Sequence, residues 1–181
     1  MNKIILAAIV PLMFLMLSLS AQDGYPVPPK TDKTLFYIQR NHNKNTIMYD
    51  ANFDEDGNLN KKKPVKVYWI RYEEKGQKMK LRRLERWMVY GVKCRKTKKE
   101  GYDFKVNLAA SDKISLYLKQ VAPFKAEIHI DIKGDIFELE HIYAKLSEGS
   151  WMPKPEYAEL YGYDLTTGEP VYKKIDPKDI K

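Results

Sequence analysis

Alternating apolar and polar residues between Ala126 and Tyr143, AEIHIDIKGDIFELEHIY, constrain the fold more than any other feature of the chain. On the first arm every second residue from Ile128 to Ile132 is isoleucine, with charged or polar residues between them. Neighbouring side chains of a strand point to opposite faces of a sheet, so each arm predicts a strand with one apolar face. A two-residue turn that includes Gly134 would bring these isoleucines opposite Phe137 and Leu139, which predicts a β-hairpin.

Segments rich in β-branched and aromatic residues recur along most of the chain. We predict strands at residues 35–40, 46–53, 65–72, 92–99, 102–108 and 114–118, and a short strand at 171–172. Together with the hairpin they predict a mainly β fold of about eight short strands. Closing the sheet removes its exposed edges, so we expect an antiparallel lipocalin-like barrel, with a β-sandwich as the alternative.

One segment, KLRRLERWMVYG at residues 80–91, does not follow this pattern. Its apolar residues recur at helical spacing, and arginines occupy the opposite side. The apolar stripe consists of Leu81, Leu84, Trp87 and Met88. We predict one amphipathic helix, about three turns long and ended by Gly91, that packs this stripe on the sheet and turns its arginines to solvent. The alternative is a basic helix that lies on a membrane surface.

The first residues differ in composition from the rest of the chain. A lysine near the start, an apolar run at Ile4–Leu17 and small residues before the end at Ala21 predict a secretory signal peptide over residues 1–21. A membrane anchor is the alternative, which the short apolar run and Pro11 disfavour. Residues 22–33 are then a Pro-rich tether and residues 34–181 a single β-rich domain. We expect an exported protein, periplasmic or extracellular, that is not an integral membrane protein after cleavage.

Positive charge is concentrated in the middle of the chain. Residues 61–99 contain 16 lysine or arginine residues and 3 acidic ones, whereas the whole chain has 32 and 24. This concentration predicts a surface that attracts anionic lipids or polysaccharides of the cell envelope, while an exported location disfavours nucleic acid. A merely solvated surface is the alternative. The residues assigned to this surface are Lys61, Lys62, Lys63, Arg82, Arg83 and Arg86.

The stretch NFDEDGNLNKKK at residues 52–63 resembles a calcium loop, because Asn and Asp residues alternate around Gly57. A calcium loop of this type lies between helices and ends on a glutamate, but here the last position is Lys63 and the flanks are predicted strands. We therefore predict an ordinary loop with its turn at Asp56 and Gly57, and neither a metal nor a cofactor. Calcium binding by residues 52–60 stays open.

A second polar set points to a ligand. It comprises Gln39, Arg40, Asn43, Asn45, Trp69 and Arg71. Alternation along the predicted strand 65–72 puts Trp69 and Arg71 on one face with two valines. If this face is interior, Arg71 is a cation in an apolar setting and needs an anionic partner. That partner is either a carboxylate of the protein or a carboxylate or phosphate of a ligand, held by two hydrogen bonds.

The charged face of the hairpin is the candidate for chemistry. Its residues are Glu127, His129, Asp131, Glu138 and Glu140. Carboxylates beside an imidazole can hold a metal or act as an acid and base, and the alternative is a solvated face with cross-strand pairs. The sequence has no Ser-His-Asp order, Gly-rich phosphate loop, H-E-x-x-H or C-x-x-C motif. We predict no catalytic residue.

Two further residues receive structural interpretations. His141 falls on the apolar face of the hairpin and is predicted to be a core histidine. Cys94 is the single cysteine, so the chain has no internal disulfide, and we expect it to be a buried small apolar residue rather than a catalytic thiol.

Several ordered blocks resemble a known family. The blocks are LFYIQR (35–40), NKNTIMYDAN (43–52), KKPVKVYWIRY (62–72), YGV (90–92) and W-x-P (151–153). Over residues 35–175 the chain resembles a family of small exported bacterial proteins, domain of unknown function 4833. The resemblance implies one domain behind a signal peptide, and it implies no activity, substrate or catalytic residue.

These observations favour an exported, non-catalytic binding protein of the cell envelope that takes a small amphipathic or anionic ligand. One alternative is a surface-interaction protein that uses the basic residues against anionic lipids or polysaccharides. A weaker alternative is a hydrolase that uses the charged face of the hairpin.

Overall fold

A single long sheet organises the chain in the computed structural model, which describes residues 24–149, 154–176 and 178. The predicted signal peptide lies outside these residues. The strands are β1 (Thr34–Arg40), β2 (Asn43–Ala51), β3 (Val65–Arg71), β4 (Gln77–Lys80), β5 (Val92–Lys96), β6 (Phe104–Leu108), β7 (Ser111–Ala122), β8 (Lys125–Ile132), β9 (Asp135–Leu146), β10 (Pro155–Asp164) and β11 (Pro170–Ile175). A short helical segment, α1 (Arg83–Glu85) followed by the π-helical turn η1 (Arg86–Tyr90), connects β4 to β5.

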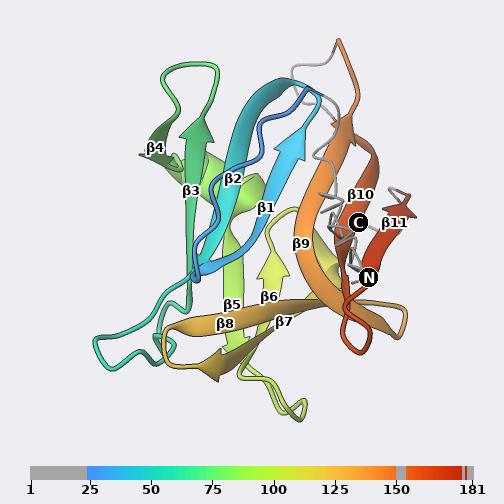
Figure 1. The fold of residues 1–181 in the computed structure, drawn as a ribbon. Helices are drawn as coiled ribbons and strands as arrows, with labels where there is room; N and C mark the ends of the chain where they lie inside the picture. Colours follow the sequence, from blue (N-terminus) through green and yellow to red (C-terminus); the bar gives the residue numbers. More distant parts are fainter. Residues whose placement is uncertain (1–23, 150–153, 177, 179–181) are drawn as a thin grey trace, which may run out of the picture.

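Strand β9 gives the sheet its shape, because one of its edges forms hydrogen bonds with two different strands along its length. It pairs with β8 through Asp135–Glu138 and then with β1 through His141–Ala144, while β10 covers its other edge and pairs with β11. The order is β4-β3-β2-β1-β9-β8-β7-β6-β5, and all pairs are antiparallel except β1 with β9. The sheet therefore curls into a half-barrel around one core, which confirms the mainly β prediction (Figure 1).

The interior of the half-barrel is filled by side chains. The largest fully buried ones come from both halves of the sheet, and they include Phe36, Tyr49, Trp69, Leu116, Ile128 and Phe137. Interiors of this kind are close-packed. The half-barrel therefore encloses a packed core, unlike a hollow ligand-binding barrel. A ligand would have to bind at its rim or on its surface.

The predicted hairpin is confirmed. Its turn consists of Lys133 and Gly134, both with positive φ, and Ile130 lies opposite Phe137. The prediction that His141 lies on the apolar face of the hairpin is wrong. A bulge at Glu140 shifts the register of β9 against β10, so that Ile142 joins the core while His141 turns to the outer layer. An extra residue in one strand reverses the alternation of every side chain beyond it.

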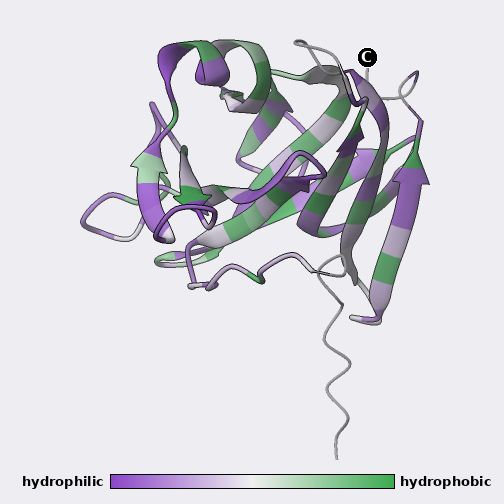
Figure 2. Ribbon diagram, turned by 90° about the horizontal axis from the view of Figure 1, so that it is seen from above, coloured by the Kyte–Doolittle hydropathy of each residue, from purple (hydrophilic) through white to green (hydrophobic). Residues whose placement is uncertain are grey.

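The prediction that the helix packs its apolar residues on the sheet is wrong for most of them. The helical segment is shorter than expected, and Leu84, Trp87 and Met88 are 63 %, 75 % and 42 % exposed instead of packed on the sheet. The inward residues are Glu85 and Tyr90, five apart, because the segment ends in a π-helical turn. Figure 2 shows the segment at the edge of the fold, with hydrophobic and hydrophilic residues side by side.

Gly91 ends the helical segment, as predicted. A Cβ at Gly91 would lie 1.9 Å from the carbonyl oxygen of Arg86, so only glycine allows the chain to leave the π-helical turn here. Strand β5 follows at once.

The N-terminal segment of the described chain contacts β1 and β9, and the C-terminal strands extend the sheet from β9. The segment 24–33, predicted to be a tether, buries Pro28, receives a hydrogen bond from Gln39 Nε2 at the carbonyl of Pro26 (2.8 Å), and pairs Lys30 with Glu140. Near the C-terminus, β10 and β11 return to the sheet as predicted. No helix among the described residues has the length and apolarity needed to cross a bilayer.

Candidate functional site

Two arginines approach the same tryptophan at one end of the half-barrel. Arg40 is the last residue of β1 and Arg71 the last residue of β3, and both strands run toward this end because each pairs antiparallel with β2. The guanidinium carbons lie 4.8 Å and 4.9 Å from the centre of the Trp69 ring. Both distances are within the range of a cation–π contact. The predicted contacts Arg40, Trp69 and Arg71 are therefore brought together.

The ring of Trp69 is held in place from the helical segment. It is 1 % exposed, and its Nε1 donates a hydrogen bond to Oε2 of Glu85 over 3.1 Å. Tyr90 meets the ring edge-on with 5.2 Å between ring centres, and the hydroxyl of Tyr49 donates to the carbonyl of Tyr90. The Trp69 ring is thus positioned by contacts with Glu85 and Tyr90.

The two guanidinium groups are poorly neutralised. Among the described residues neither has a carboxylate oxygen within 4.0 Å, and the Nε of Arg71 is buried without a hydrogen-bond partner. Burial lowers the pKa of Arg40 to about 10; Glu85 and Glu73 offset part of this effect, and the positive charge of Arg71 adds to it. Arg40 therefore remains cationic at neutral pH, and an anion would stabilise its charge.

The other predicted ligand contacts have structural roles. Asn45 is buried and accepts a hydrogen bond from the backbone of Glu73, while Asn43 accepts one from the backbone of Asn45. Gln39 is buried on the opposite face of β1. Sequence reasoning missed Glu85 and Tyr90, because their inward orientation depends on a π-helical turn that the α-helical spacing conceals.

The predicted basic surface is divided between two segments. Lys61, Lys62 and Lys63 are exposed on the loop between β2 and β3, at the foot of these strands in Figure 1. Arg82 and its neighbours Arg83 and Arg86 are exposed on the connection from β4 to β5. The two groups of cations are therefore separate features of the surface.

The loop that resembles a calcium site is a turn between strands, as predicted. Oδ1 of Asp54 accepts hydrogen bonds from the backbone of Asp56 and Asn58, and Gln120 bonds the loop to the end of β7. The loop borders a hollow of about 680 Å³, whose walls include Asp54, Asp56, Lys61, Lys96, Tyr102 and Asp103. Within residues 24–149, 154–176 and 178 no three His, Cys, Asp or Glu side chains are arranged to hold a metal.

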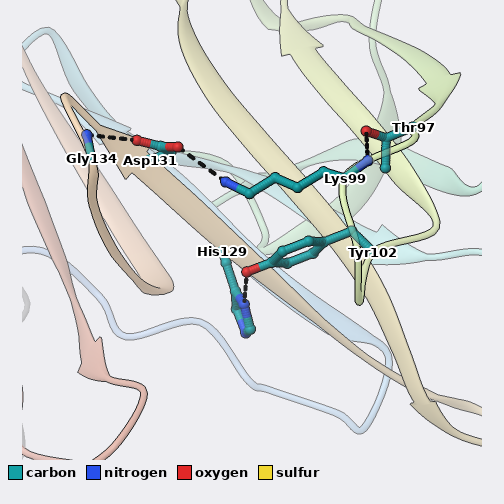
Figure 3. A network of polar contacts seen from close by, with 6 residues as sticks. All are labelled: Thr97, Lys99, Tyr102, His129, Asp131 and Gly134. Atoms are coloured by element: carbon teal, nitrogen blue, oxygen red, sulfur yellow. Dashed lines mark hydrogen bonds and ion pairs between the residues drawn. The ribbon is translucent and has the colours of Figure 1, made fainter.

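A polar network covers the outer face of β8 (Figure 3). The hydroxyl of Tyr102 lies 2.9 Å from Nδ1 of His129, and Lys99 pairs with Asp131 at 3.1 Å. Burial lowers the pKa of His129, although Glu127 opposes this shift. The network therefore attaches the loop between β5 and β6 to β8 while keeping the imidazole neutral at pH 7.

This network gives little support to a hydrolase. Burial raises the pKa of Glu138, with Glu127 adding to the shift, and burial also raises the pKa of Tyr102. The hollow is lined by Tyr102 but not by His129 or the two glutamates. An acid and base pair needs shifted groups that share a cleft with the substrate.

Aromatic rings form a row across four neighbouring strands on the outer layer. Tyr37, His141, Tyr161 and Tyr172 follow one another with ring centres 4.3 Å, 5.2 Å and 5.3 Å apart. Glu159 accepts hydrogen bonds from the hydroxyls of Tyr161 and Tyr172. Burial, with a contribution from Lys30, lowers the pKa of His141 to about 3. His141 is thus buried and neutral as predicted, but it lies in the outer aromatic row rather than in the core, and its Nε2 has no hydrogen-bond partner among the described residues.

Comparison with known proteins identifies the domain and no activity. The model of a protein family described as "Domain of unknown function (DUF4833)" matches residues 36–174, which includes almost all of the sheet. Neither the curated proteins nor the solved structures contain a match.

Proposed function

This chain belongs to the DUF4833 family, and we propose that it is a non-catalytic binding protein that holds a small anionic group at the end of the half-barrel where Arg40 and Arg71 lie. The observation that carries the proposal is the pair of cations on Trp69 without a carboxylate within 4.0 Å among the described residues. A partly buried charge is costly unless it is paired. A bound anion would supply such a partner.

The chemistry of the pair favours a carboxylate or a phosphate. A guanidinium group presents a planar set of donors that matches the paired oxygens of these anions. The Nε of Arg71 is buried without a hydrogen-bond partner in the described chain, so a ligand would bind the terminal nitrogens of the guanidinium group. Because the core is filled by side chains, the ligand would lie at the rim of the half-barrel, where both arginines are partly exposed.

The location of the protein is part of the same proposal. The predicted signal peptide at residues 1–21 supports export to the periplasm or beyond. Anionic ligands in the cell envelope include the headgroups of lipids and the acidic groups of polysaccharides. The proposed ligand is therefore amphipathic or anionic, in agreement with the sequence analysis.

Calorimetric titration with inorganic phosphate, acetate and a short-chain alkyl phosphate tests the proposal. We expect wild-type protein to bind at least one of these probes, and Arg40→Gln and Arg71→Gln each to weaken binding roughly tenfold or more, as loss of a charge-assisted hydrogen bond would. Arg95→Gln, at an exposed arginine of β5, is the matched control and should bind like wild type. Absence of binding up to about 10 mM probe, or equal affinity of all four proteins, would refute the site.

A further inference from the structure

We propose that the helical segment Arg83–Tyr90 is a membrane-contact element, in which Leu84, Trp87 and Met88 enter the interface of an anionic lipid bilayer while neighbouring cations contact the headgroups. This inference does not depend on an anion bound at Arg40 or Arg71. It starts from the residues that the fold leaves in solvent.

The exposed apolar residues of the described chain are concentrated in one place. Among the residues that the structure describes, ten large hydrophobic ones are exposed, and five of them lie within residues 79–89. These five are Met79, Leu84, Trp87, Met88 and Val89. Single exposed hydrophobic residues are ordinary, but a contiguous group of them marks an interaction surface.

Cations surround this group. Residues 77–96 contain eight lysine or arginine residues and one acidic residue, Glu85. Glu85 is turned inward, where its carboxylate accepts hydrogen bonds from Trp69 Nε1 and from the backbone of Arg82. The outer surface of the segment is therefore apolar and cationic, which complements an anionic surface with an apolar layer beneath it.

An anionic bilayer fits the composition of this surface. Arg83 and Arg86 lie next to Leu84 and Trp87 in sequence, and over residues 77–96 the cations outnumber the acidic residues eight to one. In a membrane interface the two kinds of side chain are compatible, because tryptophan rings lie at the level of the headgroups and long cationic side chains reach the phosphates.

The segment is also held rigidly enough to present these residues. Glu85 and Tyr90 anchor it to Trp69, and Gly91 lets the chain turn directly into β5. The outward position of Trp87 thus follows from the fold, and its side chain needs no rearrangement of the core to reach a bilayer.

Co-sedimentation with vesicles tests the inference. The protein would be purified from the periplasm of an expressing host, and its mass would verify that the predicted signal peptide has been removed. Vesicles of phosphatidylcholine alone are compared with vesicles that contain about one-third phosphatidylglycerol. We expect binding to the anionic vesicles only, weakened by salt, with a blue shift of tryptophan emission.

Three variants separate the contributions. Leu84→Ala with Trp87→Ala should reduce the partition coefficient at least tenfold, and Leu165→Ala, at an exposed apolar residue of the β10–β11 turn, should leave it unchanged. Arg40→Gln with Arg71→Gln should keep vesicle binding even where it loses soluble anions, so failure of one proposal is distinguishable from failure of the other.

Two outcomes would overturn the inference. One is that wild-type protein does not bind anionic vesicles, or that the Leu84/Trp87 variant binds them as well as the Leu165 variant does. The other is that the protein does not bind vesicles but self-associates in ultracentrifugation, and that Trp87→Ala abolishes this self-association. The segment would then be a contact between copies of the chain.

Discussion

Acidification from pH 7 to pH 5 should destabilise the protein, and His141 is one of the residues responsible. Its side chain is 2 % exposed and stacked between Tyr37 and Tyr161, and its Nε2 atom has no hydrogen-bond partner within the described chain. Burial lowers its pKa to about 3, and the positive charge of Lys30 adds to the shift. The folded protein therefore holds this imidazole neutral far below the pH at which a free histidine takes up a proton.

The sign and size of the effect follow from proton linkage. Unfolding exposes His141 and returns its pKa to 6.5. Below that pH the imidazole is therefore protonated in the unfolded chain while it stays neutral in the folded chain. The stability that the neutral imidazole contributes is complete above pH 6.5 and is lost as the pH falls toward 3. Each pH unit in this window costs about 1.4 kcal/mol, so that at pH 5 the loss is about 2 kcal/mol.

Urea denaturation at pH 7 and pH 5 measures the loss, with His141→Phe as the comparison. Phenylalanine keeps a ring between Tyr37 and Tyr161 but cannot take up a proton, so wild type should lose about 2 kcal/mol more than the variant on acidification. His129, whose pKa is also lowered by burial, is present in both proteins and cancels in the difference. Equal losses, or an NMR titration in which the His141 ring protonates near pH 6.5, would refute the reasoning.

Two further substitutions test contacts of the sheet. Gly162→Ala would place a Cβ 1.9 Å from the carbonyl oxygen of Glu138 and 2.8 Å from the ring of Phe137, so thermal unfolding should show a loss of about 1–3 kcal/mol or more. Tyr102→Phe removes the hydroxyl that is hydrogen-bonded to His129 and should lower the free energy of unfolding in urea by about 1 kcal/mol. An unchanged unfolding midpoint in either variant would contradict these contacts.

The two sides of the segment 81–91 carry the two functional proposals. Its inner side, Glu85 and Tyr90, holds Trp69 between Arg40 and Arg71, and its outer side exposes Trp87. A variant that melts this segment would disturb both sites. The side-chain substitutions proposed above are therefore more informative than a deletion.

Local features of the fold were predictable from the residues. The alternation in the hairpin correctly separated Ile130 and Phe137 from the charged face, and Gly134 correctly marked its turn. Gly91 correctly marked the end of the helical segment. Each of these predictions needs only the periodicity of a strand or helix and the conformational range of glycine.

The candidate site was only half predictable. Alternation along one strand put Trp69 and Arg71 on the same face, which is a local property. The contact of Arg40 with Trp69 requires β1, β2 and β3 to lie side by side in the sheet. The hydrogen bond that holds the Trp69 ring requires Glu85, which follows β4 in the chain, to lie next to β3. Contacts of this kind join residues that are distant in sequence and have no periodic signal.

The sequence by itself determined which side chains share a face of each strand, since that follows from backbone geometry over a few residues. Tertiary structure decided how the faces are used. The bulge at Glu140 reversed His141, the edge of β9 accepted β1 in parallel, and a π-helical turn directed Trp87 to solvent. The physical reason is that these choices are settled by the total packing of the sheet, in which a gain in many distant contacts outweighs a local preference.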